Sequence, residues 1–237
     1  MTRRPDAGAT KTGRSELIFP DAIFFDFDGV LVESNAIKVD AFERLYAGYG
    51  PAILARVMDY IDGNEGISRV EKIRHAHEAF LGVRLGDAEL SVLAERYSQM
   101  VEAAVATCPW VSGAREFLET YAGRLPLFVV TGTPEVEIRR IADRRGLTPY
   151  FREIRGSPPR KPPIVRELLD RHRLAAERAV FIGDAPFDRQ TALETGLRFI
   201  GRVPAGRPSP FPTATETAPD LRDLAERLAA PVDITIA

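Results

Sequence analysis

The stretch AIFFDFDGVL, residues 22–31, combines an apolar run with two acidic residues. Its apolar part, residues 22–27, is continuous rather than alternating, which is typical of a parallel strand that helices cover on both faces. Asp26 and Asp28 lie two residues apart, so the two-residue period of a strand points both side chains the same way. Ligands of open α/β sheets bind at the carboxyl ends of the strands. The stretch therefore predicts a strand that ends in a site containing two carboxylates.

Three further apolar runs, at residues 127–130, 179–182 and 198–200, have the same continuous character. Patterns with a helical period lie between and after them. Strands that alternate with helices indicate an α/β fold with a doubly wound parallel sheet. The predicted helices are residues 114–121, 135–145 (with Gly146 as the stop), 163–172, 189–195 (closed by Gly196) and 220–229.

Residues 35–107 do not follow this alternation. Four successive amphipathic patterns there favour a small helical bundle inserted after the first strand. The hinges of this insertion are expected at residues 34–35 and 108–109. The predicted organisation is a tail at residues 1–15, a core made of residues 16–34 and 108–237, and a helical cap at residues 35–107.

Composition narrows the class of protein. The chain has 237 residues and a net charge of −2, so it lacks the basic surface typical of proteins that bind nucleic acid or anionic membranes. It contains one cysteine, which excludes an intrachain disulfide, and no run long enough for a membrane helix or apolar enough for a secretory signal. We expect a cytoplasmic monomer or small homo-oligomer with no nucleic-acid or membrane partner.

The neighbouring carboxylates Asp26 and Asp28 repel one another, and a hard cation such as Mg²⁺ would offset this repulsion. The alternative is that one carboxylate caps a turn and the other is solvated. At the end of the second strand, Thr131 and Gly132 offer a hydroxyl and backbone N–H groups that can cradle a phosphate. Thr133, which precedes a proline, has a simpler interpretation as a helix N-cap.

Two later segments add charged groups. Lys161 stands just before a predicted helix, where a cation opposes the helix dipole, so it either meets an anion or is simply exposed. Asp184 follows the third apolar run and could complete a metal site with Asp26. Asp188 could act as the N-cap of the next helix.

Taken together, these segments resemble the haloacid dehalogenase superfamily of phosphatases and phosphomutases, and most closely its β-phosphoglucomutase and phosphoglycolate-phosphatase-like branch. The resemblance covers residues from about 22 to about 202, and its joint pattern is far more specific than any single motif. The four motifs are the DFDGVL segment at residues 26–31, Thr131, Lys161, and Gly183-Asp184 followed by Asp188. The superfamily has a Rossmann-like core, and the helical insertion matches its cap placed after the first motif.

The resemblance implies roles for these residues. Asp26 would be the nucleophile that receives the phosphoryl group, and Asp28 the general acid and base. Mg²⁺ would bind Asp26, the backbone carbonyl of Asp28, and Asp184. Thr131, Gly132 and Lys161 would bind the phosphoryl oxygens. Asp188 would orient Lys161 or a metal-bound water rather than bind the metal directly.

The cap offers candidates for substrate recognition. In the β-phosphoglucomutase branch a Gly-x-Ser-Arg stretch reads the substrate, and residues 66–69 match it. Ser68, Arg69 and Lys72 are therefore candidate specificity residues. The alternative is a helix N-terminus with Ser68 as its cap and Arg69 exposed.

The expected substrate is a small phosphorylated metabolite, either a sugar phosphate or a compound similar to phosphoglycolate. The expected chemistry is phosphoryl transfer, because Asp28 matches the acid–base residue that the carbon–halogen dehalogenases of the superfamily lack. The expected reaction is hydrolysis of the phosphomonoester. A phosphomutase is the first alternative, and a catalytically silent binding protein on the same scaffold is the second.

Overall fold

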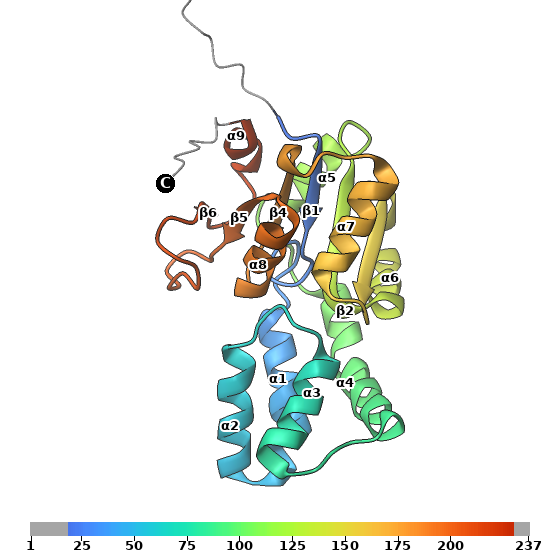
Figure 1. The fold of residues 1–237 in the computed structure, drawn as a ribbon, viewed down its shortest axis with the longest axis vertical. Helices are drawn as coiled ribbons and strands as arrows, with labels where there is room; N and C mark the ends of the chain where they lie inside the picture. Colours follow the sequence, from blue (N-terminus) through green and yellow to red (C-terminus); the bar gives the residue numbers. More distant parts are fainter. Residues whose placement is uncertain (1–18, 230–237) are drawn as a thin grey trace, which may run out of the picture.

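The computed structural model describes residues 19–229, so the predicted tail at residues 1–15 lies outside the described part. A parallel sheet has the strand order β3-β2-β1-β4-β5-β6 (Figure 1). This confirms the predicted α/β class. The strands are β1 (Ala22–Phe25), β2 (Leu127–Pro134), β3 (Glu153–Ser157), β4 (Ala179–Gly183), β5 (Arg198–Arg202) and β6 (Thr217–Ala218).

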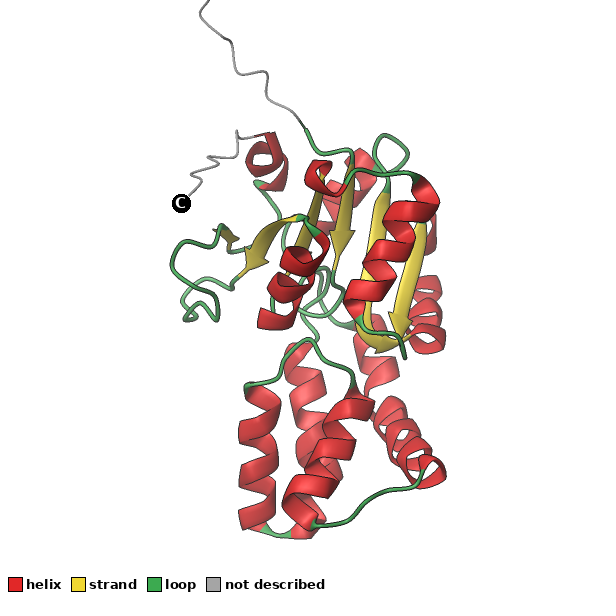
Figure 2. Cartoon of the chain, in the orientation of Figure 1, coloured by secondary structure: helices red, strands yellow, loops and turns green. Residues whose placement is uncertain are grey.

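Alternate residues of β1 explain why its sequence is apolar throughout. Ile23 and Phe25 belong to one buried cluster, which includes side chains from α5 (Ala114–Tyr121), α6 (Glu135–Arg144) and α9 (Leu224–Ala229). Ala22 and Phe24 belong to a second cluster with α7 (Lys161–His172) and α8 (Pro186–Thr195). Helices thus cover both faces of the sheet (Figure 2), and neither set of side chains in β1 meets solvent.

Two strands were not predicted. β3 forms one edge of the sheet, and its sequence EIRGS contains a single large apolar residue, Ile154. An edge strand pairs through its backbone on one side only, so it does not need the apolar run that marks a central strand. β6, at the opposite edge, has only two residues.

Several predicted boundaries were wrong by a few residues. β1 ends at Phe25, two residues before the predicted end, and the chain then turns through Gly29, whose φ is +71°. The period of the strand therefore does not extend to Asp28. Helices α7 and α8 both begin earlier than predicted because proline is tolerated in the first turn of a helix. Helix α9 begins at Leu224 rather than at residue 220.

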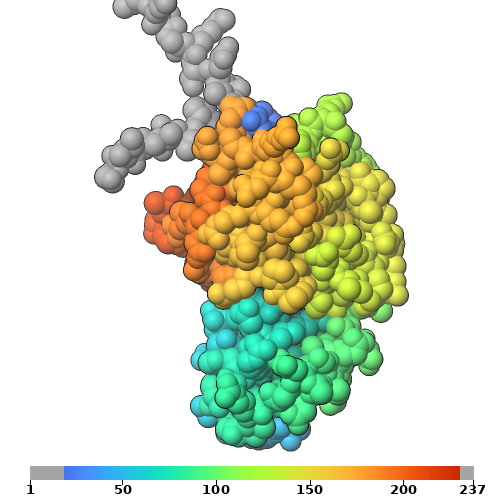
Figure 3. Space-filling model, turned by 45° about the vertical axis from the view of Figure 1, so that its right-hand side comes forward, coloured from blue at the N-terminus to red at the C-terminus, as the bar shows by residue number. Residues whose placement is uncertain are grey.

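The insertion, residues 35–107, consists of α1 (Asn35–Tyr46), α2 (Pro51–Asp62), α3 (Arg69–His75) with a π-helical continuation (Ala76–Leu81), and α4 (Asp87–Thr107). These helices pack on one another and lie beyond the carboxyl ends of the strands (Figure 1), and they form the lower part of the molecule in Figure 3. Helix α4 also packs on α6 of the core. In the described part of the chain, no helix is both long and apolar enough to cross a membrane.

Candidate active site

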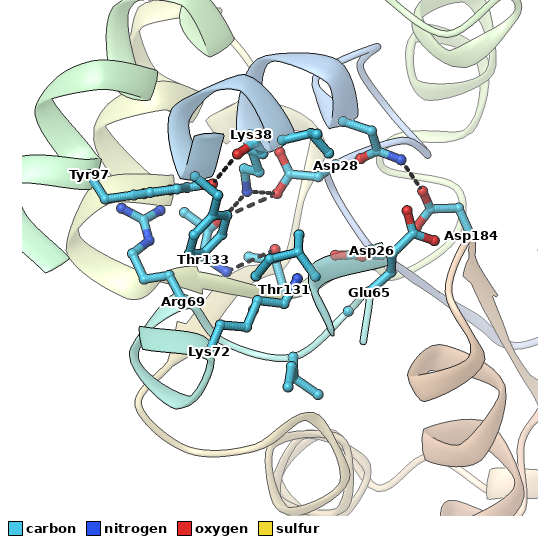
Figure 4. A pocket seen from close by; sticks show the side chains of 17 residues that line it. Asp26, Asp28, Lys38, Glu65, Arg69, Lys72, Tyr97, Thr131, Thr133 and Asp184 are labelled. Atoms are coloured by element: carbon cyan, nitrogen blue, oxygen red, sulfur yellow. Dashed lines mark hydrogen bonds and ion pairs between the residues drawn. The ribbon is translucent and has the colours of Figure 1, made fainter. Parts of the chain in front are cut away.

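Parallel strands bring four sequence-distant side chains to one edge of the sheet. Asp26 follows β1, Thr131 lies in β2, and Asp184 follows β4. Lys161 is the first residue of α7 rather than the residue before it. Asp26, Thr131 and Asp184 line one cavity (Figure 4), and the Lys161 ammonium lies 2.9 Å from Asp26 Oδ2.

Lys161 joins two of the carboxylates. Its Nζ lies 2.9 Å from Asp26 Oδ2 and donates to Asp188 Oδ1 at 2.5 Å, and all three residues are buried. Burial disfavours the ammonium form, but the charges of Asp188 and Asp26 outweigh it and raise the pKa of Lys161. Lys161 is therefore not simply exposed. It is a fixed cation beside Asp26 Oδ2, while Asp26 Oδ1 accepts a hydrogen bond from the Phe27 N–H at 2.7 Å.

Asp188 is not the N-cap of α8. Helix α8 begins at Pro186, which places Asp188 in its first turn, where Oδ2 accepts a hydrogen bond from the Ala185 N–H at 3.1 Å. The other carboxylate oxygen holds Lys161. Asp188 is thus fixed by one backbone group and one cation, and its contact with Lys161 is the arrangement that the resemblance implied.

Three carboxylates form a group that could hold a metal ion. Asp26, Asp184 and Asp188 each contribute one carboxylate oxygen, and these three oxygens lie within 4.8 Å of one another. Burial, followed by the charges of Asp26 and Asp188, raises the pKa of Asp184 well above its ordinary value. A hard divalent cation would relieve this repulsion, and carboxylate oxygens are the donors that Mg²⁺ prefers. The donor set therefore fits Mg²⁺.

Glycine is required where the chain passes this group. A Cβ at Gly29 would lie 1.9 Å from Asp184 Oδ2 and 2.4 Å from Asn35 Nδ2, and the φ of this residue is positive. Asn35 Nδ2 donates to Asp184 Oδ2 at 2.6 Å. The first residue of the insertion thus contacts a candidate metal ligand of the core.

The side chain of Asp28 takes part in a separate network and is not among the three clustered carboxylates. Ser34 Oγ donates to Asp28 Oδ1 at 2.6 Å, Thr133 Oγ1 donates to Oδ2 at 3.0 Å, and Lys38 Nζ forms an ion pair with Oδ2. Burial raises the pKa of Asp28, but the charge and hydrogen bond of Lys38, with the two hydroxyls, outweigh it and lower the pKa. These contacts favour the ionised form of Asp28, whose side chain lines the cavity.

The phosphate-binding candidates Thr131 and Gly132 lie within β2, which extends four residues beyond its predicted end at residue 130. Thr131 is buried and its Oγ1 accepts a hydrogen bond from the Thr133 N–H at 3.2 Å. A Cβ at Gly132 would lie 3.1 Å from the Gly66 carbonyl oxygen, so the loop before α3 approaches the end of β2 closely. Thr133 lies within β2 and contacts Asp28, whereas the N-cap position of α6 is Pro134.

The cavity, of about 90 Å³, lies between the strand ends and the insertion. The insertion supplies an apolar patch, formed by Val39, Phe42 and Ile61, and two cations, Arg69 and Lys72. Figure 4 shows both walls. A small molecule bound here would contact carboxylates and hydroxyls on one side, and apolar groups and cations on the other.

The predicted specificity residues have different surroundings. Ser68 caps α3, with its Oγ accepting from the Glu71 N–H at 3.3 Å. Arg69 is not exposed: it is 5% exposed and contacts both carboxylate oxygens of Glu137 in α6, at 2.7 Å and 2.6 Å. Lys72 is buried and lines the cavity.

Sequence reasoning missed Lys38, Glu65 and Glu137. A partial signal existed for Lys38: it lies four residues after Ser34, so one turn of helix brings both side chains toward Asp28. No sequence signal marked Glu137, because an acidic residue in the first turn of a helix is common without a buried partner.

Comparison with known proteins identifies the family. The model of the family described as haloacid dehalogenase-like hydrolase matches residues 23–202. This chain belongs to the haloacid dehalogenase-like hydrolases. A phosphoglycolate phosphatase from Rhodobacter capsulatus is 30% identical over 197 residues, which cover 80% of this chain and 87% of that protein.

A 5'-nucleotidase from Pseudomonas aeruginosa is 38% identical, but over 95 residues only, so the match spans 38% of this chain and less than half, 43%, of that protein. The crystal structure of the putative HAD-hydrolase YfnB from Bacillus subtilis, bound to magnesium, has a TM-score of 0.65 and 18% identity. The match covers 90% of this chain and all of that one. The family match and the phosphatase relatives confirm the expected superfamily and support a phosphatase.

Proposed function

We propose that this protein hydrolyses a small phosphomonoester in a Mg²⁺-dependent reaction, through a phospho-aspartate on Asp26. The observation that carries the proposal is the surroundings of Asp26. Its Oδ2 lies 2.9 Å from the Lys161 ammonium, two further carboxylates lie within 4.8 Å, and the residue borders a cavity that also contains Thr131 and Asp28. A carboxylate nucleophile needs nearby positive charge because it attacks an anionic phosphoryl group.

Asp26, Asp184 and the backbone carbonyl of Asp28 would hold Mg²⁺, which would neutralise phosphoryl charge and orient the group for attack. The remaining work belongs to the chain itself. In the first step, a carboxylate oxygen of Asp26 forms a bond to phosphorus while the bond from phosphorus to the substrate oxygen breaks. Thr131, the Gly132 N–H and Lys161 stabilise the oxygens of the transferring group.

Asp28 has two tasks in this scheme. In the first step, protonated Asp28 gives its proton to the departing substrate oxygen and becomes ionised. In the second step, ionised Asp28 takes a proton from the attacking water as the water oxygen bonds to phosphorus, the bond from phosphorus to the Asp26 oxygen breaks, and phosphate leaves. Its hydrogen bonds from Ser34 and Thr133 fix its orientation, and Lys38 favours the ionised form that the second step requires.

We propose further that residues 35–107 act as a cap that opens to admit substrate and closes to exclude water. Two contacts between the insertion and the core support this role: Asn35 with Asp184, and Arg69 with Glu137. A cytoplasmic location stays a prediction from the sequence.

The test is phosphate release from a panel of sugar phosphates and small phosphorylated acids, with Mg²⁺, with EDTA, and with Asp26→Asn. We expect release that requires Mg²⁺ and disappears in the variant. If the folded protein with Mg²⁺ releases no phosphate, β-glucose 1-phosphate with a bisphosphate primer separates the two alternatives, because a mutase converts the sugar phosphate and a silent scaffold does not.

A further inference from the structure

Two cations project from α3 toward the cavity, and they differ in whether a partner neutralises them. Arg69 contacts both oxygens of Glu137, donates to Ser98 Oγ at 2.6 Å, and lies over the Tyr97 ring, 4.6 Å from its centroid. A guanidinium paired in this bidentate way has its planar donor edge occupied by a carboxylate. The Arg69 guanidinium is therefore already paired within the protein.

Lys72 has no such partner. It is 8% exposed, and no carboxylate within the described residues lies within 4.0 Å of its Nζ and no side-chain hydrogen bond forms. Its nearest aromatic neighbour is Phe42, with Nζ 5.7 Å from the ring centroid. A buried ammonium without a hydrogen-bonding anion is unfavourable unless a ligand supplies one.

The charged groups around Lys72 do not form an ion pair with its ammonium. Lys38 of α1 repels it, while Glu65, Asp184 and Asp28 attract it from beyond ion-pair distance. Burial first, and then Lys38, lower the pKa of Lys72 to about 8. The site thus holds a cation that an incoming anion would stabilise.

The position of Lys72 in the cavity suggests which part of a ligand it meets. Asp26, Thr131 and Lys161 stand at the strand ends, where the transferring phosphoryl group would lie. Lys72 belongs to the opposite, helical wall, which also contributes the apolar side chains of Val39, Phe42 and Ile61. The cavity of about 90 Å³ leaves room for a short carbon chain between the two walls.

Resting on the proposed function, we infer that the substrate carries a second anionic group, a carboxylate or a second phosphate, at the end away from the transferred phosphoryl group, and that Lys72 rather than Arg69 binds it. Arg69 instead fastens the helical wall to the core through Glu137. The substrate class is a short phosphorylated acid or a bisphosphate, in preference to a phosphorylated alcohol or neutral sugar.

Three substrates on one carbon skeleton test the inference: glycerol 3-phosphate, whose tail is neutral, 3-phosphoglycerate, whose tail is a carboxylate, and glycerol 1,3-bisphosphate. With the full chain and Mg²⁺, we expect kcat/KM to be at least about tenfold higher for one or both substrates with an anionic tail, the size of effect that one favourable charge contact gives. Comparison of the carboxylate with the bisphosphate identifies the anion.

In Lys72→Met, which keeps the length of the side chain without its charge, the ratio of kcat/KM between anionic and neutral tails should fall to about one. Arg74→Met is the matched control, because Arg74 is an exposed cation of the same helix, and it should leave the ratio unchanged. The inference is overturned if the wild-type protein shows no preference or if Lys72→Met keeps it. An equal loss for all three substrates also overturns it, because Lys72 would then bind the transferred phosphoryl group.

Calorimetric binding of the same compounds to Asp26→Asn separates this inference from the proposed function. Preferential binding of the anionic tails that disappears in Asp26→Asn/Lys72→Met supports the inference even if no substrate is hydrolysed. Hydrolysis of the panel without any preference that depends on Lys72 supports the function and refutes the inference.

Discussion

The two walls of the cavity are built differently. The wall at the strand ends holds Asp26, which contacts the Lys161 ammonium within the core, and Asp184, which accepts a hydrogen bond from Asn35. The wall formed by the insertion holds Lys38, which pairs with Asp28 of the core, and Lys72, which has no ion-pair partner among residues 19–229. The first wall is organised to move a phosphoryl group. The second is organised to select what carries it.

This difference suggests that substitutions at the strand ends should affect all substrates alike, whereas substitutions on the helical wall should change preference or closure. A substitution at the strand ends that changed substrate preference, or one on the helical wall that affected all substrates alike, would contradict this comparison.

The largest effect is expected at Asp26. Asp26→Asn removes the nucleophile and should lower kcat by at least about a thousand-fold for every substrate. Asparagine has nearly the same size, so the variant should stay folded, as circular dichroism would confirm. Turnover within about tenfold of the wild-type rate would exclude Asp26 as the nucleophile.

Lys161→Met should come next. It removes a cation from the phosphoryl site and should lower kcat by about a hundred-fold to a thousand-fold, the range for loss of one preorganised charge-stabilising donor. The loss should be the same for neutral and anionic tails, in contrast to Lys72→Met. Arg166→Met, an exposed change in the same helix, is the control. A loss confined to one substrate class would contradict a role at the phosphoryl group.

The Arg69–Glu137 pair should matter for stability. Either single change, Arg69→Leu or Glu137→Leu, leaves an unpaired buried charge and should lower the free energy of unfolding by about 3–5 kcal/mol. The double variant should lose clearly less than the sum of the two. Urea unfolding measures these free energies. The control is Arg140→Ala, which breaks a surface pair with Glu102 and should lower the free energy of unfolding by at most about 1 kcal/mol. Additive single effects would show that the two side chains are not coupled.

The smallest effect is a pH dependence of substrate preference. Burial and Lys38 lower the pKa of Lys72 to about 8, so its ammonium form, which binds anions, is lost as the pH rises through this value. The preference for 3-phosphoglycerate over glycerol 3-phosphate should therefore decline between pH about 7 and about 10, where an unperturbed lysine would still be mostly charged. A ratio that stays constant across this range would contradict the account.

The wall at the strand ends could largely be predicted from the sequence because strand direction fixes it. A buried parallel strand has a continuous apolar run, and the polar residue after it must face the common edge. This logic places Asp26, Thr131 and Asp184 without any knowledge of packing. It does not extend to Asp28, because β1 ends at Phe25 and the chain turns at Gly29. The direction of the strand therefore does not determine the partners of Asp28.

The helical wall could be predicted only as helices. Amphipathic patterns locate residues 35–107, but they do not specify which polar side chain pairs with the core. Arg69 and Lys72 are both basic and three residues apart, so the sequence does not distinguish them. Glu137, which neutralises one and not the other, lies 68 residues away from Arg69. Such a contact depends on how the helices pack rather than on any local pattern.

The most direct test of the central claim is to identify the phosphorylated residue during turnover. The full chain would be mixed with Mg²⁺ and its best substrate, quenched in acid within one turnover, and analysed by peptide mass spectrometry. The account predicts an acid-stable phosphoryl adduct on Asp26 that is absent in Asp26→Asn and without Mg²⁺. Phosphate release with an adduct on another residue, or undiminished release by Asp26→Asn, would contradict it.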